Sequence, residues 1–262
     1  MAEIAGTKLS IDVRLLPATG ARVLDIGCGD GRHIAVAASR GCRAVGLDYD
    51  VGELRRARER VAGGVEFVAA DASRLPFRTA AFDAAICTET LEHLPDDRGA
   101  VREIARVLRP GGLLLGAVPS HFTELLYWTL SRGYHDTPGG HVRIYRPQAL
   151  ASMLERSGLR LQSVRYLHFV DSIVWLRFCL TDFLRPPRRR AHTAYEQAIA
   201  LAVVQQRETP AWRHHLRRAI GRSRFIAAVD AAGACFWPKS FAFVARKTPD
   251  ESERCIDPEV KP

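Results

Sequence analysis

The amino-acid sequence predicts a doubly wound, Rossmann-like α/β fold, in which parallel strands alternate with helices. Two observations predict it: five short apolar runs are separated by amphipathic stretches, and a glycine-rich turn follows the first run. Apolar residues make up 47% of the 262 residues and charged residues 26%, which is enough to build a core and excludes a wholly disordered chain. We therefore expect one globular domain over residues 1–262.

The five apolar runs are expected to be buried strands, because each is short and is bounded by turn residues. The clearest helix precedes the last run, where Val101, Ile104, Ala105 and Leu108 recur at helical spacing. Arg109-Pro110-Gly111-Gly112 is expected to end this helix. The predicted strands span residues 22–26, 43–47, 65–69, 82–87 and 113–118.

The pattern changes after residue 119. Residues 120–146 are rich in aromatic residues, His and Gly, and we expect a loop there that covers the acceptor of a reaction. Residues 170–238 are helical in pattern and basic, and we expect them to form a helical insertion. Around them the sequence predicts a helix over 147–157, strands over 159–169 and 240–245, and a disordered tail over 247–262.

Composition excludes several classes of protein. The six cysteines contain no CxxC pair, so neither a zinc site nor a disulfide framework is expected. The net charge is +9, but the sequence holds no RNA-binding module and no basic stripe interleaved with aromatic residues, so no nucleic-acid partner is expected. The chain has no secretory signal pattern and no run of about 18 apolar residues, so a cytoplasmic location is expected.

One segment raises the alternative of membrane association. Residues 173–190 combine an apolar run containing Trp175 and Phe178 with the basic cluster Arg188 to Arg190. Such a segment is suited to peripheral contact with anionic lipid headgroups. The alternative is a solvated basic corner on an ordinary helix.

The first predicted strand ends in a glycine turn, Asp25-Ile26-Gly27-Cys28-Gly29-Asp30-Gly31. Glycine adopts positive φ and lets a ligand approach the backbone, so a cofactor is expected at this strand end. A dinucleotide fingerprint reads GxGxxG, whereas here the third glycine comes one residue early. This spacing disfavours a nicotinamide-dependent oxidoreductase.

Polar residues also end the next three strands. Asp48 ends the second and can accept both hydroxyls of a ribose, Asp71 follows the third and can accept an adenine amino group, and Thr88 ends the fourth. Each has a purely structural alternative: Asp48 and Asp50 as helix caps, Asp71 as the start of a turn, and the glycines as a tight connection. Together they predict a nucleoside site.

At these residues the chain resembles the class I S-adenosylmethionine-dependent methyltransferases, particularly the branch of ubiquinone- and menaquinone-pathway and sugar O-methyltransferases. The segments Arg106 to Gly112 and Gly139 to Arg146 add to the resemblance. It implies a seven-stranded, mostly parallel sheet with an antiparallel last strand, preceded by the helical insertion. It also implies that residues 20–119 form the cofactor-binding half.

The resemblance implies S-adenosylmethionine as cofactor and a role for each strand end. Residues 25–31 would hold the methionine moiety, Asp48 the ribose, and Asp71 with Ala72 the adenine. The expected cofactor-binding residues are Asp25, Gly27, Cys28, Gly29, Gly31, Asp48, Tyr49, Asp71, Ala72 and Thr88.

On the acceptor side, a hydroxyl needs a general base, and histidine is the usual choice near neutral pH. We expect His141 and Tyr145 to be catalytic; the alternative for His141 is a loop histidine bonded to backbone. Glu89, Glu92 and His93 would share one face of a helical turn and could bind Mg²⁺ or Mn²⁺, but the same pattern also buttresses helix starts. No metal site is assigned.

The sequence therefore predicts a methyltransferase that acts on a small molecule at oxygen, with a sugar, quinone-like or lipid-linked hydroxyl as acceptor. The alternative is a non-catalytic protein that binds S-adenosylmethionine or S-adenosylhomocysteine. Nothing in the sequence indicates an oligomeric state.

Overall fold

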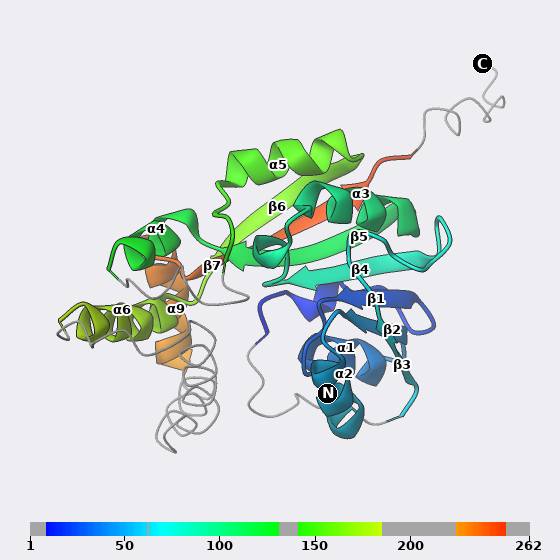
Figure 1. The fold of residues 1–262 in the computed structure, drawn as a ribbon, viewed down its shortest axis with the longest axis horizontal. Coiled ribbons are helices and arrows are strands. Elements are labelled where there is room, and N and C mark those ends of the chain that lie inside the picture. The colour runs from blue at the N-terminus through cyan, green and yellow to red at the C-terminus, as the bar shows by residue number, and fades with distance from the viewer. Residues whose placement is uncertain (1–8, 62, 131–140, 185–223, 250–262) are drawn as a thin grey trace, which may run out of the picture. The chain divides into compact units, whose positions relative to one another are not determined.

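The computed structural model describes residues 9–61, 63–130, 141–184 and 224–249. These residues contain one mixed seven-stranded sheet with the order β3-β2-β1-β4-β5-β7-β6 and an antiparallel last strand, which confirms the predicted fold class (Figure 1). The strands are β1 (Arg22–Ile26), β2 (Arg43–Asp48), β3 (Val65–Ala69), β4 (Phe82–Thr88), β5 (Leu108–Pro119), β6 (Leu159–Leu167) and β7 (Ser240–Lys247). The helices are η1 (Val13–Leu15), α1 (Arg32–Ser39), α2 (Val51–Arg60), η2 (Leu91–His93), α3 (Asp97–Val107), α4 (His121–Leu130), α5 (Pro147–Arg156), α6 (Phe169–Leu184) and α9 (Arg224–Ala234).

The order of the parallel strands places a crevice at the end of β1. Asp25 of β1 pairs in register with Gly46 of β2 on one side and with Ile86 of β4 on the other. The chain leaves β1 toward β2 and later returns to β4, so the direction of winding reverses at β1. Ligands of doubly wound folds bind at the carboxyl ends of the strands next to such a reversal.

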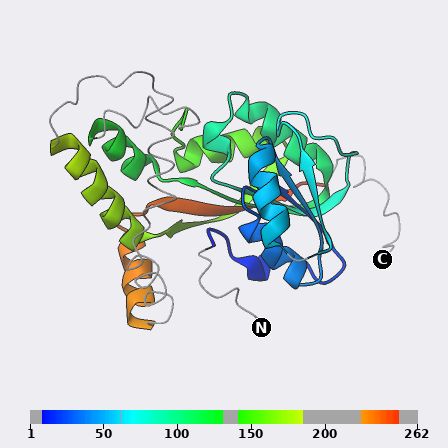
Figure 2. The ribbon, with the colours of Figure 1, turned by 60° about the horizontal axis from the view of Figure 1, so that its bottom comes forward.

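Helices cover both faces of the sheet because each presents an apolar stripe to it. Ile34 and Ala37 of α1 belong to one buried cluster with Val23, Ala84 and Leu115 of the sheet. On α3, which lies on the opposite face (Figure 2), Val101, Ile104 and Ala105 are buried, as their spacing predicts. Burial of these side chains supplies the main driving force for this part of the fold.

The predicted helix end is confirmed, but the predicted start of the next strand is not. Helix α3 ends at Val107, two residues before Arg109-Pro110-Gly111-Gly112, and these four residues lie within β5, which begins at Leu108 rather than at residue 113. The register explains this: Phe82 pairs with Leu108 and Ala84 with Leu113, so the four residues form an irregularity inside the strand. Gly111 permits this irregularity, because it adopts a φ of 75°.

The prediction of a loop over 120–146 was wrong for residues 121–130, because α4 forms there. A hydrogen bond from the Ser120 N–H to the Lys239 carbonyl, 2.9 Å long, holds the start of α4 in place. Thr123, Glu124 and Tyr127 of α4 are buried. Residues 131–140 lie outside the described residues. The insertion is helical where the structure describes it, in α6 and α9, whereas residues 185–223 and most of the predicted tail, 250–262, lie outside.

The chain divides into two compact units, which we treat separately. The sheet unit holds residues 9–117, 147–164 and 242 onward, and the helical unit holds 118–146 and 165–241. Within the helical unit, the Tyr127 hydroxyl of α4 donates to the Ser172 carbonyl of α6 at 2.7 Å. In the part of the chain that the structure describes, every helix is too short or too polar to cross a bilayer.

The close packing of β5 on β7 predicts the effect of one added methyl group. A Cβ on Gly116 would lie 2.1 Å from the Phe243 ring, so Gly116→Ala should lower the free energy of unfolding by about 1–3 kcal/mol through overpacking. Denaturant titration measures this, with Gly63→Ala as control because its Cβ would meet nothing within 4 Å. Adding Phe243→Leu should recover part of the loss. Equal stability of the two alanine variants would contradict the packing.

Candidate functional site

The glycine turn after β1 has the backbone that its sequence predicts. Gly27, Gly29 and Gly31 adopt φ values of 67°, 51° and 81°. A Cβ on Gly27 would lie 2.3 Å from the Thr90 hydroxyl oxygen, and one on Gly31 would lie 2.8 Å from a Val61 methyl group, so both positions are closed by the protein itself. A Cβ on Gly29 would meet nothing within 4 Å, so among these three glycines of the turn it is Gly29 that borders open space.

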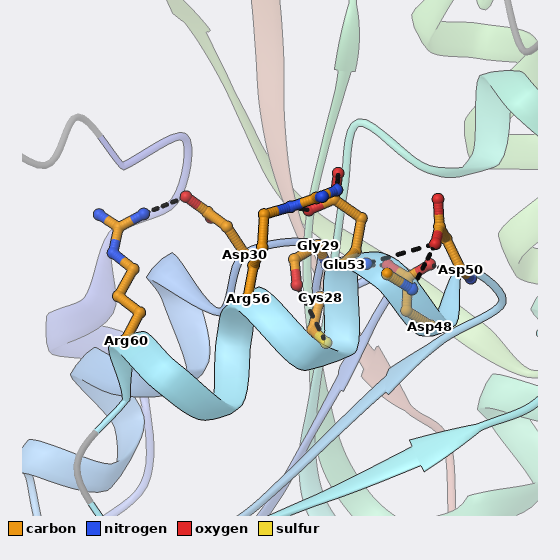
Figure 3. A network of polar contacts seen from close by, with 9 residues as sticks. Cys28, Gly29, Asp30, Asp48, Asp50, Glu53, Arg56 and Arg60 are labelled. Atoms are coloured by element: carbon orange, nitrogen blue, oxygen red, sulfur yellow. Dashed lines mark hydrogen bonds and ion pairs between the residues drawn. The ribbon is translucent and has the colours of Figure 1, made fainter. Parts of the chain in front are cut away.

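Asp48 at the end of β2 holds this turn in place. Its Oδ2 accepts a hydrogen bond from the Gly29 N–H at 2.8 Å, and its Oδ1 accepts one from the Asp50 N–H at 2.9 Å (Figure 3). A carboxylate oxygen can accept further hydrogen bonds beyond these. The side chain predicted to bind ribose therefore also fixes the loop that would surround the ligand.

The neighbouring acids are structural. Asp50 caps α2, with its Oδ1 accepting from the Gly52 N–H at 2.6 Å, so the capping alternative holds for Asp50 but not for Asp48. Asp30 forms an ion pair with Arg60 at the other end of α2 (Figure 3). Both contacts join the glycine turn and β2 to α2.

Asp25 is the most unusual group of the site. Its side chain is buried, with 1% of the residue exposed, and neither carboxylate oxygen has a hydrogen bond of good geometry among the described residues, although the Ile34 N–H is near enough to lower its pKa. Burial raises the pKa of Asp25 to about 8, although nearby Arg32 opposes the shift. A buried polar group without a partner is costly and points to a ligand that supplies one.

The other predicted cofactor residues differ in exposure. Cys28 is buried, and this burial raises the pKa of its thiol. Its Sγ packs closely against Gly46 of β2, since a Cβ on that glycine would lie 3.0 Å from the sulfur. Tyr49 is 84% exposed, which leaves its ring available to a ligand. Asp71 begins a turn, because its Oδ1 accepts from the Ser73 N–H at 2.8 Å and this bond lowers its pKa. Ala72 beside it is buried.

Sequence reasoning missed His33, which contacts the predicted residue Thr88. The His33 Nδ1 lies 3.2 Å from the Thr88 hydroxyl, and Nε2 accepts the Ser10 N–H at 3.4 Å. Burial, followed by the charge of Arg32, lowers the pKa of His33 to about 3, so the ring is neutral. It carries its proton on Nδ1 and donates to Thr88. The sequence signal available for His33 was its place as the second residue of α1. A histidine at that position is equally compatible with an ordinary core residue.

The segment after β4 departs from the expected helical turn. Glu89 has a φ of 52°, and the short helix η2 begins only at Leu91. Glu89 therefore lies outside the short helix that holds Glu92 and His93, so the three do not form one continuous helical turn. The Thr90 hydroxyl donates to the Thr88 carbonyl at 3.0 Å and packs against Gly27, so this segment closes one side of the glycine turn.

The predicted catalytic residues belong to the helical unit. The His141 Nδ1 lies 2.8 Å from Glu124 Oε2 of α4, so this nitrogen contacts a side chain. Tyr145 is buried, with 6% of the residue exposed. Sequence reasoning missed Glu124, because it is separated from His141 by 17 positions and belongs to no local motif with it.

The aromatic residues predicted to cover the acceptor include several with structural contacts. Tyr127 packs against Trp175 with ring centroids 6.3 Å apart, and Phe122 meets Trp237 edge to face at 6.0 Å. Part of the segment with the predicted lipid contact is described: Ile173 and Leu180 of α6 are exposed. Arg188 to Arg190 lie outside the described residues, and membrane contact stays a prediction.

The residues of the sheet unit fit S-adenosylmethionine in charge and in space. Its ammonium group would supply the partner that buried Asp25 lacks, and Gly29 leaves room for the amino-acid chain. Asp48 adds acceptor oxygens at the tip of β2, beside the same turn. No residue of this set fills the space at Gly29.

A family of known proteins matches part of this unit. A family model described as a methyltransferase domain matches residues 24–116. An O-methyltransferase of Penicillium expansum is 40% identical over 44% of this chain and 44% of its own length. The 27-O-demethylrifamycin SV methyltransferase of Amycolatopsis mediterranei is 41% identical over 36% of this chain and 37% of its own. The chain thus spans less than half the length of these two relatives.

The fold comparison extends over more of the chain. A solved S-adenosylmethionine-dependent methyltransferase from Methanosarcina mazei has a TM-score of 0.55, covering 91% of this chain and 97% of its own at 16% identity. This likeness shows the fold. Residues 24–116 therefore match a methyltransferase domain, and the strand order is that of the Rossmann-like methyltransferase fold.

Proposed function

We propose that the protein transfers a methyl group from S-adenosylmethionine to a hydroxyl oxygen of a small molecule. The binding of S-adenosylmethionine is supported by the Asp25 carboxylate. It is buried without a hydrogen-bond partner, beside a glycine turn that borders open space. The acceptor half is supported by the relatives named O-methyltransferase and by the His141 and Glu124 pair.

On the donor side, each residue has a distinct task. Asp25 binds the ammonium group of the methionine moiety, because an ion pair offsets the cost of burying its charge. Asp48 accepts hydrogen bonds from the ribose hydroxyls while it keeps Gly29 in place. Asp71, Ala72 and Tyr49 bind the adenine, and Gly27, Cys28, Gly31 and Thr88 shape the walls.

On the acceptor side, His141 takes the proton of the acceptor hydroxyl as the oxygen attacks. When bound, S-adenosylmethionine supplies an activated methyl group, whose carbon–sulfur bond breaks as the new carbon–oxygen bond forms, leaving S-adenosylhomocysteine. Holding the reacting atoms in line can lower the barrier by roughly 7–11 kcal/mol, and a general base adds about 10²- to 10⁴-fold. Tyr145 helps orient the acceptor oxygen.

The first test concerns Asp48. In Asp48→Asn an amide NH₂ group replaces one of the two acceptor oxygens, so either Gly29 or Asp50 loses its hydrogen bond. We expect S-adenosylmethionine to bind about 10- to 100-fold more weakly by calorimetry, equivalent to about 1–3 kcal/mol. Glu66→Gln, an exposed acid on β3, is the matched control. Unchanged affinity in a folded Asp48→Asn protein would remove Asp48 from the site.

The second test uses the pKa of Asp25. Because the folded-state pKa of about 8 lies above the value near 3.9 in an unfolded chain, the folded protein binds one more proton between these values. Its free energy of unfolding should therefore fall as the pH rises from 5 to 8, by up to about 1 kcal/mol per pH unit relative to Asp25→Asn. Saturating S-adenosylmethionine should reduce this difference, because its ammonium group stabilises the ionised carboxylate.

Urea titrations at several pH values measure this dependence, with Glu66→Gln as control, since Glu66 is an exposed acid on β3. Parallel pH curves for wild type and Asp25→Asn would show that Asp25 does not carry a raised pKa.

The reaction itself is tested by untargeted mass spectrometry of a gene-deletion strain and its complemented partner. Complementation should restore a product heavier than its precursor by one CH₂ group, and the purified protein should form it with labelled S-adenosylmethionine. Tight binding of S-adenosylmethionine without any such product would favour the non-catalytic alternative.

A further inference from the structure

The connection between β3 and β4 is held by contacts outside itself. A crossover between parallel strands is usually a helix, whose peptide groups bond to one another. Residues 70–81, all of which the structure describes, contain neither helix nor strand. Backbone groups of such a segment need other partners, because an unpaired buried N–H or C=O is costly. The segment matters for the proposed function, because Asp71 and Ala72 near its start are the residues expected to bind the adenine.

Two side chains of α3 supply partners for this segment. Arg106 donates from Nη1 to the Phe77 carbonyl at 2.8 Å and from Nη2 to the Leu75 carbonyl at 3.0 Å. The Leu75 N–H donates in turn to Glu103 Oε2 at 2.8 Å. We call Glu103 and Arg106 the α3 clamp, because they hold the backbone on both sides of Pro76.

The two members of the α3 clamp also fix each other. Arg106 Nε donates to Glu103 Oε1 at 2.7 Å, and Nη2 donates to Oε2 at 2.8 Å. Such a two-point contact sets the relative orientation of a guanidinium and a carboxylate. The hydrogen bonds of this pair lower the pKa of Glu103 and raise that of Arg106, so both groups stay charged at neutral pH. The clamp is therefore a rigid element on the surface of α3.

The hold of the clamp extends to Asp71 through one tight turn. The Asp71 carbonyl accepts the Arg74 N–H at 3.0 Å, and its Oδ1 accepts the Ser73 N–H at 2.8 Å. Leu75 follows this turn directly and is buried, with 5% of the residue exposed. A displacement of Leu75 away from α3 would therefore move the turn on which the Asp71 carboxylate lies.

We infer that Glu103 and Arg106 are positioning residues for the recognition of the adenine base. The Asp71 carboxylate can only accept hydrogen bonds, so a turn held in one place favours a base that presents an amino group there. A turn without the clamp would have to be ordered by the ligand, which weakens binding, and it would distinguish less well between an amino group and a carbonyl oxygen. This inference rests on the proposed binding of S-adenosylmethionine.

Hydrogen exchange of the full-length protein, followed by mass spectrometry, tests the clamp without any ligand. Arg106→Lys keeps the positive charge, but a compact ammonium group cannot replace the planar fork that reaches two carbonyls and a carboxylate. Glu103→Gln removes the charge that holds the guanidinium. Backbone amides over 73–77 should exchange faster in both variants, whereas Arg102→Lys, exposed on the same helix, should behave as wild type. Unchanged exchange over 73–77 in both clamp variants would overturn the inference.

Calorimetry with two ligands tests the effect on recognition. The ligands are S-adenosylhomocysteine and S-inosylhomocysteine, in which a carbonyl oxygen replaces the amino group of the base. Wild type should bind the first about 10- to 100-fold more tightly, because the second loses a hydrogen bond to a carboxylate. In Arg106→Lys and Glu103→Gln this ratio of affinities should fall at least about fivefold, whereas Arg102→Lys should keep it.

The ratio separates recognition from stability. If the clamp only stabilised the fold, its variants would unfold at lower temperature but would keep the wild-type ratio when folded, and that result would overturn the inference. Equal binding of both ligands by wild type would also overturn it, while the proposed function would stand. If wild type binds neither ligand, the proposed function fails and the inference fails with it.

Discussion

The hydrogen bond from the Gly29 N–H to the Asp48 carboxylate is the contact on which the donor site depends. It joins the turn after β1 to the tip of β2, two segments that the parallel pairing of Asp25 with Gly46 already brings together. Without it, Gly29, the glycine of this turn that borders open space, would lose the hydrogen bond that holds it in place. The Asp50 cap and the ion pair between Asp30 and Arg60 then fasten α2 to the same turn. The binding loop is therefore organised before any ligand arrives, which lowers the entropic cost of binding.

Asp25 has the opposite effect on the protein without ligand, because its burial lowers the free energy of unfolding. A carboxylate that is buried without a partner destabilises the fold at neutral pH, and its raised pKa expresses that cost. Buried ionisable groups without a partner are typical of functional sites, where a ligand or a reaction uses them. The neutral His33, which fixes the hydroxyl of Thr88, belongs to the other class of buried polar residue, one whose partners lie within the fold. The two residues are close in sequence, but only one of them points to a ligand.

The residues expected to bind S-adenosylmethionine could be predicted from sequence because each lies at or next to the end of a strand. Each polar side chain directly follows a strand, and parallel strands bring their ends to one edge, so Asp25, Asp48, Asp71 and Thr88 could be grouped without coordinates. What failed were features set by tertiary contacts. The Arg109-Pro110-Gly111-Gly112 segment continues β5 because its neighbour β4 imposes a register irregularity, and α4 forms because its inner face packs within the helical unit. Glu124 could not be linked to His141, since no periodicity connects residues so far apart.

The central claim is that the ends of β1 and β2 hold one nucleoside with an amino-acid tail. A crystal structure of the protein grown with S-adenosylhomocysteine tests it most directly. The account predicts the ribose hydroxyls within hydrogen-bond distance of the Asp48 carboxylate and the amino group beside Asp25. A ligand bound away from both carboxylates, or a structure in which side chains fill the space at Gly29 and exclude the ligand, would contradict it.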